Sequence, residues 1–117
     1  MIIPSGTVRV LVAVRPVDFR KGLDGLAALV RETLGADPYS GVIYVFRAKR
    51  ADRVKLLLWD GTGLVLVSKR LEQGKFEWPA ISDGVMRLTA SQLSALMEGL
   101  DWRRVRGVRV HAPQEVL

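Results

Sequence analysis

Three closely spaced apolar segments limit how this chain of 117 residues can fold. Val42–Arg47, Arg53–Trp59 and Leu64–Lys69 are rich in Val, Ile, Leu and aromatic residues, a composition typical of β-strands. The linkers between them, residues 48–52 and 60–63, are short, and the second begins with the Asp-Gly pair typical of hairpin turns. Because short linkers force neighbouring strands to run antiparallel, we predict a β-meander.

A helix is predicted before the meander. Apolar residues recur at spacings of three and four from Leu23 to Leu34, which places them on one face of a helix. Asp18 is a candidate N-cap, and Gly35 is placed to end the helix. Gly22 and Gly25 lower the helix propensity near the start, so a delayed start is an alternative.

A second helix is predicted after residue 89. The segment from Thr89 to Gln92 has the pattern of a capping box, with Thr89 as N-cap and Gln92 reaching back to its N–H. The residues that follow place an apolar stripe on one helix face, formed by Leu93, Leu96, Met97 and Leu100.

Further strands are predicted on both sides of these elements. Val8–Val14 is a β-branched, apolar run, and Val85–Leu88 is a second strand candidate. Phe76–Trp78, which precedes Pro79, is a candidate for a short edge strand.

The middle strand of the meander carries different side chains on its two faces. Arg53 and Lys55 share one face with Leu57 and Trp59, because side chains alternate along a strand. The other face is entirely apolar and consists of Val54, Leu56 and Leu58. We expect that face to pack against the helix over residues 23–34.

Together these elements predict an α+β fold, an antiparallel β-meander sheet of about four to six strands packed against two helices on one side. Residues 1–102 are expected to form a single compact domain, and residues 103–117 a basic, flexible C-terminal tail.

The composition excludes several kinds of site. The chain has no cysteine, which excludes disulfides and thiolate metal sites, and His111 is its one histidine, which excludes a histidine-cluster zinc site. The N-terminal segment has no charged and apolar pattern of a signal peptide, and no apolar run approaches the roughly 20 residues of a membrane span. We expect a soluble, cytoplasmic protein.

Positive charge is concentrated in two segments. The formal net charge is +6. Residues 47–75 contain eight Lys or Arg against three acidic residues, a local charge of +5. Four arginines without an opposing acid follow between residues 103 and 109. This distribution is expected if one face contacts a polyanion, although such charge also serves solubility alone.

Catalytic chemistry finds little support in the sequence. Asp60 is the one acid with a suggestive position, at the end of a predicted strand, but a residue that begins an Asp-Gly turn usually bonds backbone N–H groups. No nucleophile elbow and no complete phosphate loop are present. We therefore expect no enzymatic activity, no catalytic residue, no metal site, no cofactor and no small-molecule substrate.

The basic hairpin is the strongest candidate site. Basic side chains beside a two-stranded ribbon can neutralise DNA phosphates, and Trp59 is a candidate for stacking on unpaired bases, although a core position is favoured. The alternative without a binding function is that these charges only keep an exposed loop soluble. The predicted nucleic-acid-binding residues are Arg47, Lys49, Arg50, Arg53, Lys55, Lys69, Arg70, Arg103, Arg104 and Arg106.

Three segments together resemble a known family. They are DFRKGLDGL (residues 18–26), VFRAKRADRVKLLLWDGTGLVLVSKRLEQGKFEWP (residues 45–79) and LTASQLSALMEGLDW (residues 88–102). The chain resembles the TnpB-type accessory protein, the second reading frame, of the insertion-sequence-66 family of transposable elements. Phe19 stands where the family usually has methionine.

The resemblance implies a role in transposition beside a separate, larger transposase that carries the catalytic acids. It supplies no established functional residues for this chain. Two hypotheses follow. In the first, the chain is a non-catalytic accessory protein that binds DNA through the basic hairpin and the arginine tail. In the second, it is a protein-interaction module that bridges or activates the transposase through a docking patch that includes Trp78 and Trp102. A nuclease that depends on Asp60 is a third, disfavoured alternative.

Overall fold

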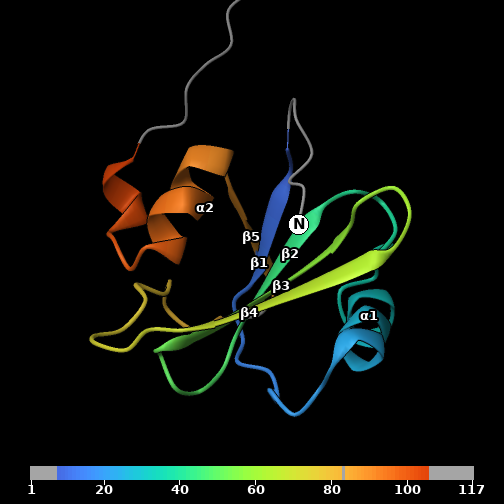
Figure 1. Cartoon of the computed structure of the whole chain (residues 1–117), viewed down its shortest axis with the longest axis horizontal. Helices are drawn as coiled ribbons and strands as arrows, with labels where there is room; N and C mark the ends of the chain where they lie inside the picture. Colours follow the sequence, from blue (N-terminus) through green and yellow to red (C-terminus); the bar gives the residue numbers. More distant parts are fainter. Residues whose placement is uncertain (1–7, 83, 106–117) are drawn as a thin grey trace, which may run out of the picture.

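The structure, a computed structural model, describes residues 8–82 and 84–105. Within these ranges the chain forms a five-stranded sheet, two α-helices and one 3-10 helix (Figure 1). The strands are β1 (Val10–Ala13), β2 (Ile43–Arg47), β3 (Arg53–Trp59), β4 (Leu64–Arg70) and β5 (Val85–Leu88). The helices are α1 (Leu23–Glu32), α2 (Ala90–Met97) and the 3-10 helix η1 (Trp102–Arg104).

The predicted meander is confirmed. Strand β3 pairs antiparallel with both β2 and β4, with Leu57 opposite Tyr44 on one side and opposite Leu66 on the other. The turn between β3 and β4 forms as expected, because the Asp60 carboxylate accepts hydrogen bonds from the backbone N–H groups of Thr62 and Gly63, both at 3.0 Å. These two bonds lower the pKa of Asp60.

The sheet is mixed, so the prediction of a purely antiparallel sheet is wrong. The strand order is β4-β3-β2-β1-β5, and β1 pairs with β2 in parallel while β5 pairs with β1 antiparallel. The physical reason is the long connection between β1 and β2, which contains α1. A connection of that length can cross over the sheet and return the chain in the same direction.

The two helices cover opposite faces of the sheet, not one face as predicted (Figure 1). Helix α1 packs Leu26, Ala27 and Val30 against the face that carries Tyr44 and Leu57. The wholly apolar face of β3, formed by Val54, Leu56 and Leu58, instead packs with Leu93 and Leu96 of α2 and with Phe76, Trp78 and Trp102. Two cores therefore sandwich β2 and β3.

The segment over residues 71–82 forms no strand, which corrects the prediction of an edge strand at Phe76–Trp78. Phe76 and Trp78 are buried in the core beside α2. The Phe76 N–H donates to the Ala51 carbonyl at 2.9 Å, and the Trp78 indole N–H donates to the same carbonyl at 3.2 Å. The burial of these two rings, rather than strand pairing, holds the segment against the sheet.

The helix ends agree with the sequence at one helix and differ at the other. Helix α1 begins late, with Gly22 as its N-cap, so the expected cap at Asp18 is wrong and the alternative of a delayed start is confirmed. Gly35 follows α1 with a φ of 61°, in the left-handed region that favours glycine. At α2 the capping box forms: the Thr89 hydroxyl accepts from the Gln92 N–H at 3.1 Å, and the Gln92 amide oxygen accepts from the Thr89 N–H at 2.9 Å.

We expect Thr89→Ala to lower the free energy of unfolding by about 1 kcal/mol, because it leaves the N–H of Gln92 without its acceptor. Urea denaturation followed by circular dichroism measures the change. Thr89→Ser, which keeps the hydroxyl, should recover most of the loss, and Ser91→Ala, at an exposed position of the same turn, should have a much smaller effect. An unchanged midpoint for Thr89→Ala would show that the box contributes nothing.

Candidate nucleic-acid interface

The loop between β2 and β3, residues 48–52, is fixed by backbone hydrogen bonds to distant segments. The Leu71 N–H donates to the Asp52 carbonyl at 2.9 Å, and the Ala51 carbonyl accepts the two bonds from Phe76 and Trp78. At the other side, the Val17 N–H donates to the Arg47 carbonyl at 2.8 Å. Both ends of the loop are therefore anchored to other segments of the fold.

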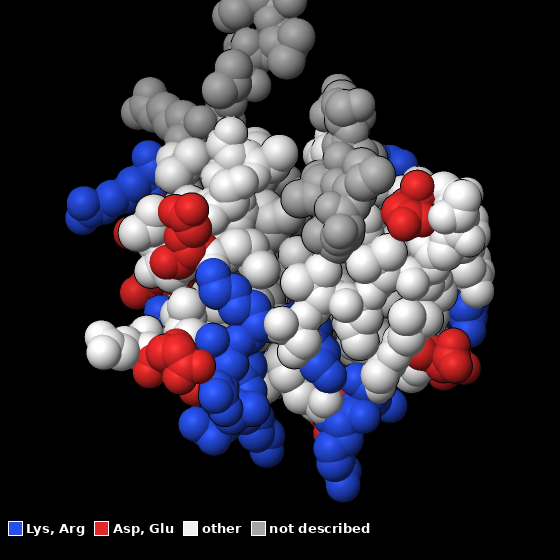
Figure 2. Space-filling model, in the orientation of Figure 1, with Lys and Arg blue, Asp and Glu red and all other residues white. Residues whose placement is uncertain are grey.

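Two of the predicted residues project from this loop. The side chains of Lys49 and Arg50 are exposed, and Arg50 contacts Asp52 at 3.4 Å while 69% of its side chain remains accessible. Figure 2 shows lysine and arginine side chains gathered over the lower part of the molecule, where Figure 1 places this loop and the loop between β1 and α1. This end of the sheet is its most positively charged region in that view.

Two more predicted arginines lie directly opposite each other on neighbouring strands. Arg53 of β3 and Arg70 of β4 are partners in the sheet register. Like charges in such a pair repel and destabilise a sheet. Each has a weak counter-charge, Asp52 at 3.7 Å from Arg53 and Glu72 at 3.4 Å from Arg70. The Arg53 Nε and the Asp52 Oδ1 are both buried without a hydrogen bond. The register thus places two like charges side by side at this end of the sheet.

Arg47 turns toward the interior. Only 9% of the residue is exposed, and its guanidinium lies 5.4 Å from the centre of the Trp78 ring. Its Nε–H donates to the Ala48 carbonyl at 3.2 Å, and burial lowers the pKa of the guanidinium. Arg47 thus packs the base of the loop and presents little charge to a partner.

The two predicted lysines on β3 and β4 bind backbone carbonyls. The Lys55 ammonium donates to the carbonyls of Phe19 at 2.7 Å and Lys21 at 3.1 Å, and it lies 5.0 Å from the Phe19 ring centre. The Lys69 ammonium donates to the Met97 carbonyl at 2.7 Å. That carbonyl belongs to the last turn of α2, where the helix dipole favours a cation. Both lysines tie a neighbouring segment to the sheet.

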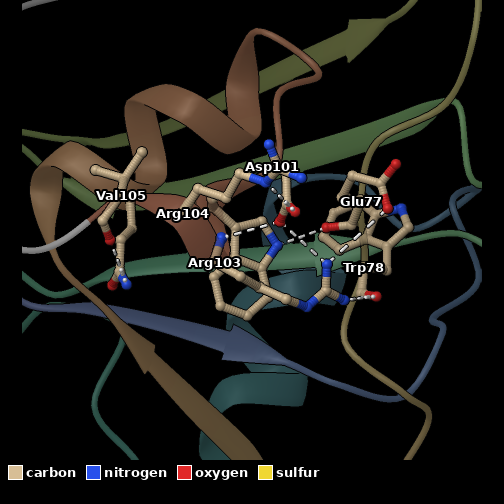
Figure 3. A network of polar contacts seen from close by, with 8 residues as sticks. Glu77, Trp78, Asp101, Arg103, Arg104 and Val105 are labelled. Atoms are coloured by element: carbon tan, nitrogen blue, oxygen red, sulfur yellow. Dashed lines mark hydrogen bonds and ion pairs between the residues drawn. The ribbon is translucent and has the colours of Figure 1, made fainter.

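The predicted tail residues that the structure describes lie in a polar network on η1 (Figure 3). Arg103 contacts Asp101 at 3.3 Å, donates to the Trp78 carbonyl at 3.0 Å, and lies 4.8 Å from the Trp102 ring centre. Arg104 contacts Asp101 at 3.6 Å. These contacts fix residues 101–105 against the segment that holds Trp78. Arg106 and the rest of the tail, His111 included, lie outside the described residues.

A cavity of about 590 Å³, wide open to solvent, lies between the β2–β3 loop and the loop that leads from β1 to α1. The sequence indicated the β2–β3 hairpin alone and did not reveal that the β1–α1 loop forms the opposite wall of the cavity. Strands β1 and β2 are parallel, so their carboxyl ends reach the same edge of the sheet, and ligands of α/β sheets often bind at such an edge. The apolar lining consists of Pro16, Val17, Phe19 and Ala48, and the charged lining of Asp18, Lys49, Arg50 and Arg53.

Asp18, the acidic residue of that lining, is engaged by Arg20. The Arg20 guanidinium donates to Asp18 Oδ2 at 2.7 Å and to Oδ1 at 3.0 Å, and the Arg20 backbone N–H donates to Oδ1 at 2.9 Å. These bonds lower the pKa of Asp18 from 3.8 to about 2. The Asp18 carboxylate is therefore ionised near neutral pH, and its charge is offset by its neighbour.

The described residues show no metal or membrane feature. Residues 8–82 and 84–105 hold no group of three or more His, Cys, Asp or Glu side chains that could bind a metal ion. Asp60 is occupied by its turn, as the sequence favoured. Among the helices that the structure describes, none is long and apolar enough to cross a bilayer.

Trp59, which the sequence favoured as a core residue over a stacking residue, is half-buried. Its ring meets that of Tyr39 edge to face, with 5.4 Å between the ring centres.

Comparisons with known proteins identify relatives over almost the whole chain. The family described as "IS66 Orf2 like protein" matches residues 8–107. Of the curated proteins, the uncharacterized protein y4jC of Sinorhizobium fredii (strain NBRC 101917 / NGR234) is 50% identical over 116 residues, which cover 99% of each chain. The uncharacterized protein y4hO of the same strain is 40% identical over 103 residues, 87% of this chain and 90% of y4hO. No solved structure matches the chain.

We expect the Asp18 carboxyl to titrate with a midpoint near pH 2, which NMR of its side chain measures. Because the pKa is lowered, the Asp18–Arg20 contact stabilises the folded state at pH values above 3.8, the ordinary pKa of the carboxyl. This contribution is lost as the pH falls through about 2. Arg20→Gln should move the midpoint up toward 3.8, while the control Arg31→Gln should leave it unchanged. A midpoint near 3.8 in the unmodified chain would contradict the contact.

Proposed function

The chain belongs to the IS66 Orf2-like family, and we propose that it is a non-catalytic accessory protein for transposition of a bacterial insertion sequence that binds DNA through the basic end of its sheet. We define this surface, the basic edge, by Lys49, Arg50, Arg53 and Arg70. The proposal places the protein in the cytoplasm, where such an element is mobilised, beside the transposase of the same element.

The observation that carries the proposal is the arrangement of cations at the basic edge. Lys49 and Arg50 are exposed on a loop whose two ends are anchored by backbone bonds to distant segments. Arg53 and Arg70 face each other across two strands without strong counter-charges. Keeping such cations close together destabilises the free protein, and phosphate groups of DNA would offset that cost.

The other predicted cations serve this surface indirectly. Arg47 packs beneath the loop, Lys55 fixes the neighbouring loop, and Lys69 fixes α2. Arg103 and Arg104 hold η1 but keep 46% and 88% of their side chains exposed, so they are candidates for a secondary contact. The proposal therefore assigns direct contact to the basic edge first.

The alternative of a protein-interaction module loses the observation that motivated it. Trp78 and Trp102 are each only 9% exposed and belong to the core beside α2, so they form no docking patch. The transposase of the same element remains a proposed partner, and it would supply the catalytic acids of the reaction.

We expect Lys49→Ala/Arg50→Ala to weaken binding to duplex DNA and to reduce its salt dependence. Fluorescence anisotropy over a series of NaCl concentrations measures both. Removal of one phosphate-binding side chain reduces the slope of log K against log salt by about 1, so the double variant should reduce it by about 2. The matched control is Arg31→Ala/Arg87→Ala, which removes the same charge from exposed positions on α1 and β5. Equal reductions in affinity for the two double variants, or no binding by the unmodified chain at low salt, would refute the proposed interface.

A further inference from the structure

We propose that the cavity between the β2–β3 loop and the β1–α1 loop holds one unpaired nucleotide of a DNA strand, with its base against Phe19 and its phosphate on Arg53. This inference rests on the proposed function and makes it more specific: the preferred ligand is a single strand or an unpaired end, not a continuous duplex.

The lining has the two halves that a nucleotide requires. Pro16, Val17, Phe19 and Ala48 supply an apolar part, which suits the face of a base. Lys49, Arg50 and Arg53 supply cations on the wall formed by the β2–β3 loop and the start of β3. The remaining charge, on Asp18, is paired with Arg20. The cavity therefore suits a ligand that has both a flat apolar part and an anionic part.

Arg53 offers a positive charge to the ligand. Its side chain lines the cavity and is 34% exposed, whereas its Nε is buried beside Asp52 Oδ1, 3.7 Å away. A phosphate oxygen that contacts the exposed part of this side chain would accept a charge-assisted hydrogen bond.

Phe19 is held in position by the sheet. The Lys55 ammonium bonds the Phe19 carbonyl and lies against its ring, so the wall of the cavity does not have to form on binding. Stacking on aromatic side chains beside a basic groove is the general way in which proteins hold single-stranded nucleic acid. Phe19 rather than Trp59 then takes the stacking role, because Trp59 packs against Tyr39 away from the cavity lining.

Other ligands fit the lining less well. Inorganic phosphate or a phosphate of duplex DNA would use the cations but leave the apolar half of the cavity empty. The stacked bases of a duplex cannot enter a cavity without leaving the helix, which costs a few kcal/mol for each base. At about 590 Å³ the cavity lies within the range of small-ligand sites, large enough for one nucleotide.

The test compares three probes by fluorescence anisotropy or competition: an oligodeoxythymidine of about 12 nucleotides, a mixed-sequence duplex of about the same length, and deoxythymidine monophosphate. The full chain is compared with Phe19→Leu, which keeps apolar volume but removes the ring, and with Tyr39→Leu, which removes an aromatic ring that is 51% exposed outside the cavity. Circular dichroism and thermal melting establish that each variant is folded.

We expect tighter binding of the single strand than of the duplex, and a loss of about tenfold in single-strand affinity for Phe19→Leu. Duplex affinity should be unchanged in that variant, and Tyr39→Leu should match the unmodified chain. If Phe19→Leu has no selective effect while Lys49→Ala/Arg50→Ala weakens both probes, the inference fails and the proposed function stands. If neither DNA binds, both fail. Mononucleotide binding as tight as the oligomer would overturn the assignment to a DNA strand.

A second measurement covers the case in which Phe19→Leu does not fold. Photocrosslinking of the unmodified chain to an oligonucleotide that contains 5-iododeoxyuridine, followed by peptide mass spectrometry, should place the crosslink on the peptide that carries Phe19. Crosslinks confined to peptides from β4 or η1 would overturn the inference.

Discussion

The burial of β2 and β3 on both faces determines where this chain can place its charged side chains. All five residues of β2 are buried, and β3 carries Val54, Leu56 and Leu58 into one core and Leu57 into the other. Strands covered on both faces have no solvent-facing side on which to place charge. Most cations of this segment therefore lie at the strand ends and in the loop between them, while Lys55, inside β3, is paired with backbone carbonyls. This concentrates positive charge at one edge.

The same burial explains why a cavity forms there. Helix α1 covers one face of the sheet and lies in the crossover that joins the parallel strands β1 and β2. The parallel pair brings the β1–α1 loop beside the β2–β3 loop, and the Val17 to Arg47 backbone bond joins them. Arg47 and Lys55 make contacts within the protein that stabilise this edge, whereas Lys49, Arg50 and Arg53 line the cavity and can contact a ligand.

The sequence predicted the hairpin pairing and one helix cap correctly, but not the pairing of strands that are distant in the chain, for a physical reason. The meander, the turn at Asp60 and the capping box at Thr89 depend on neighbours in the chain, so their signals are local. Alternation along β3 revealed that two faces exist, but not which helix covers which face. The site divides similarly: charge located the loop, whereas the inward turn of Arg47 and the wall around Phe19 depend on tertiary contacts. A charged residue at the end of an apolar strand was the one available hint that Arg47 is buried.

Nucleic acid is proposed to bind at the edge where the β1–α1 and β2–β3 loops meet. A titration of the ¹⁵N-labelled chain with a short single-stranded oligodeoxynucleotide, followed by amide chemical shifts, tests this placement residue by residue. We expect the largest chemical-shift changes in residues 16–21 and 48–53. These changes should saturate as oligonucleotide is added, and added salt should weaken the binding. Largest shifts in α2 and η1, with these two loops unchanged, would show that the proposed interface is wrong.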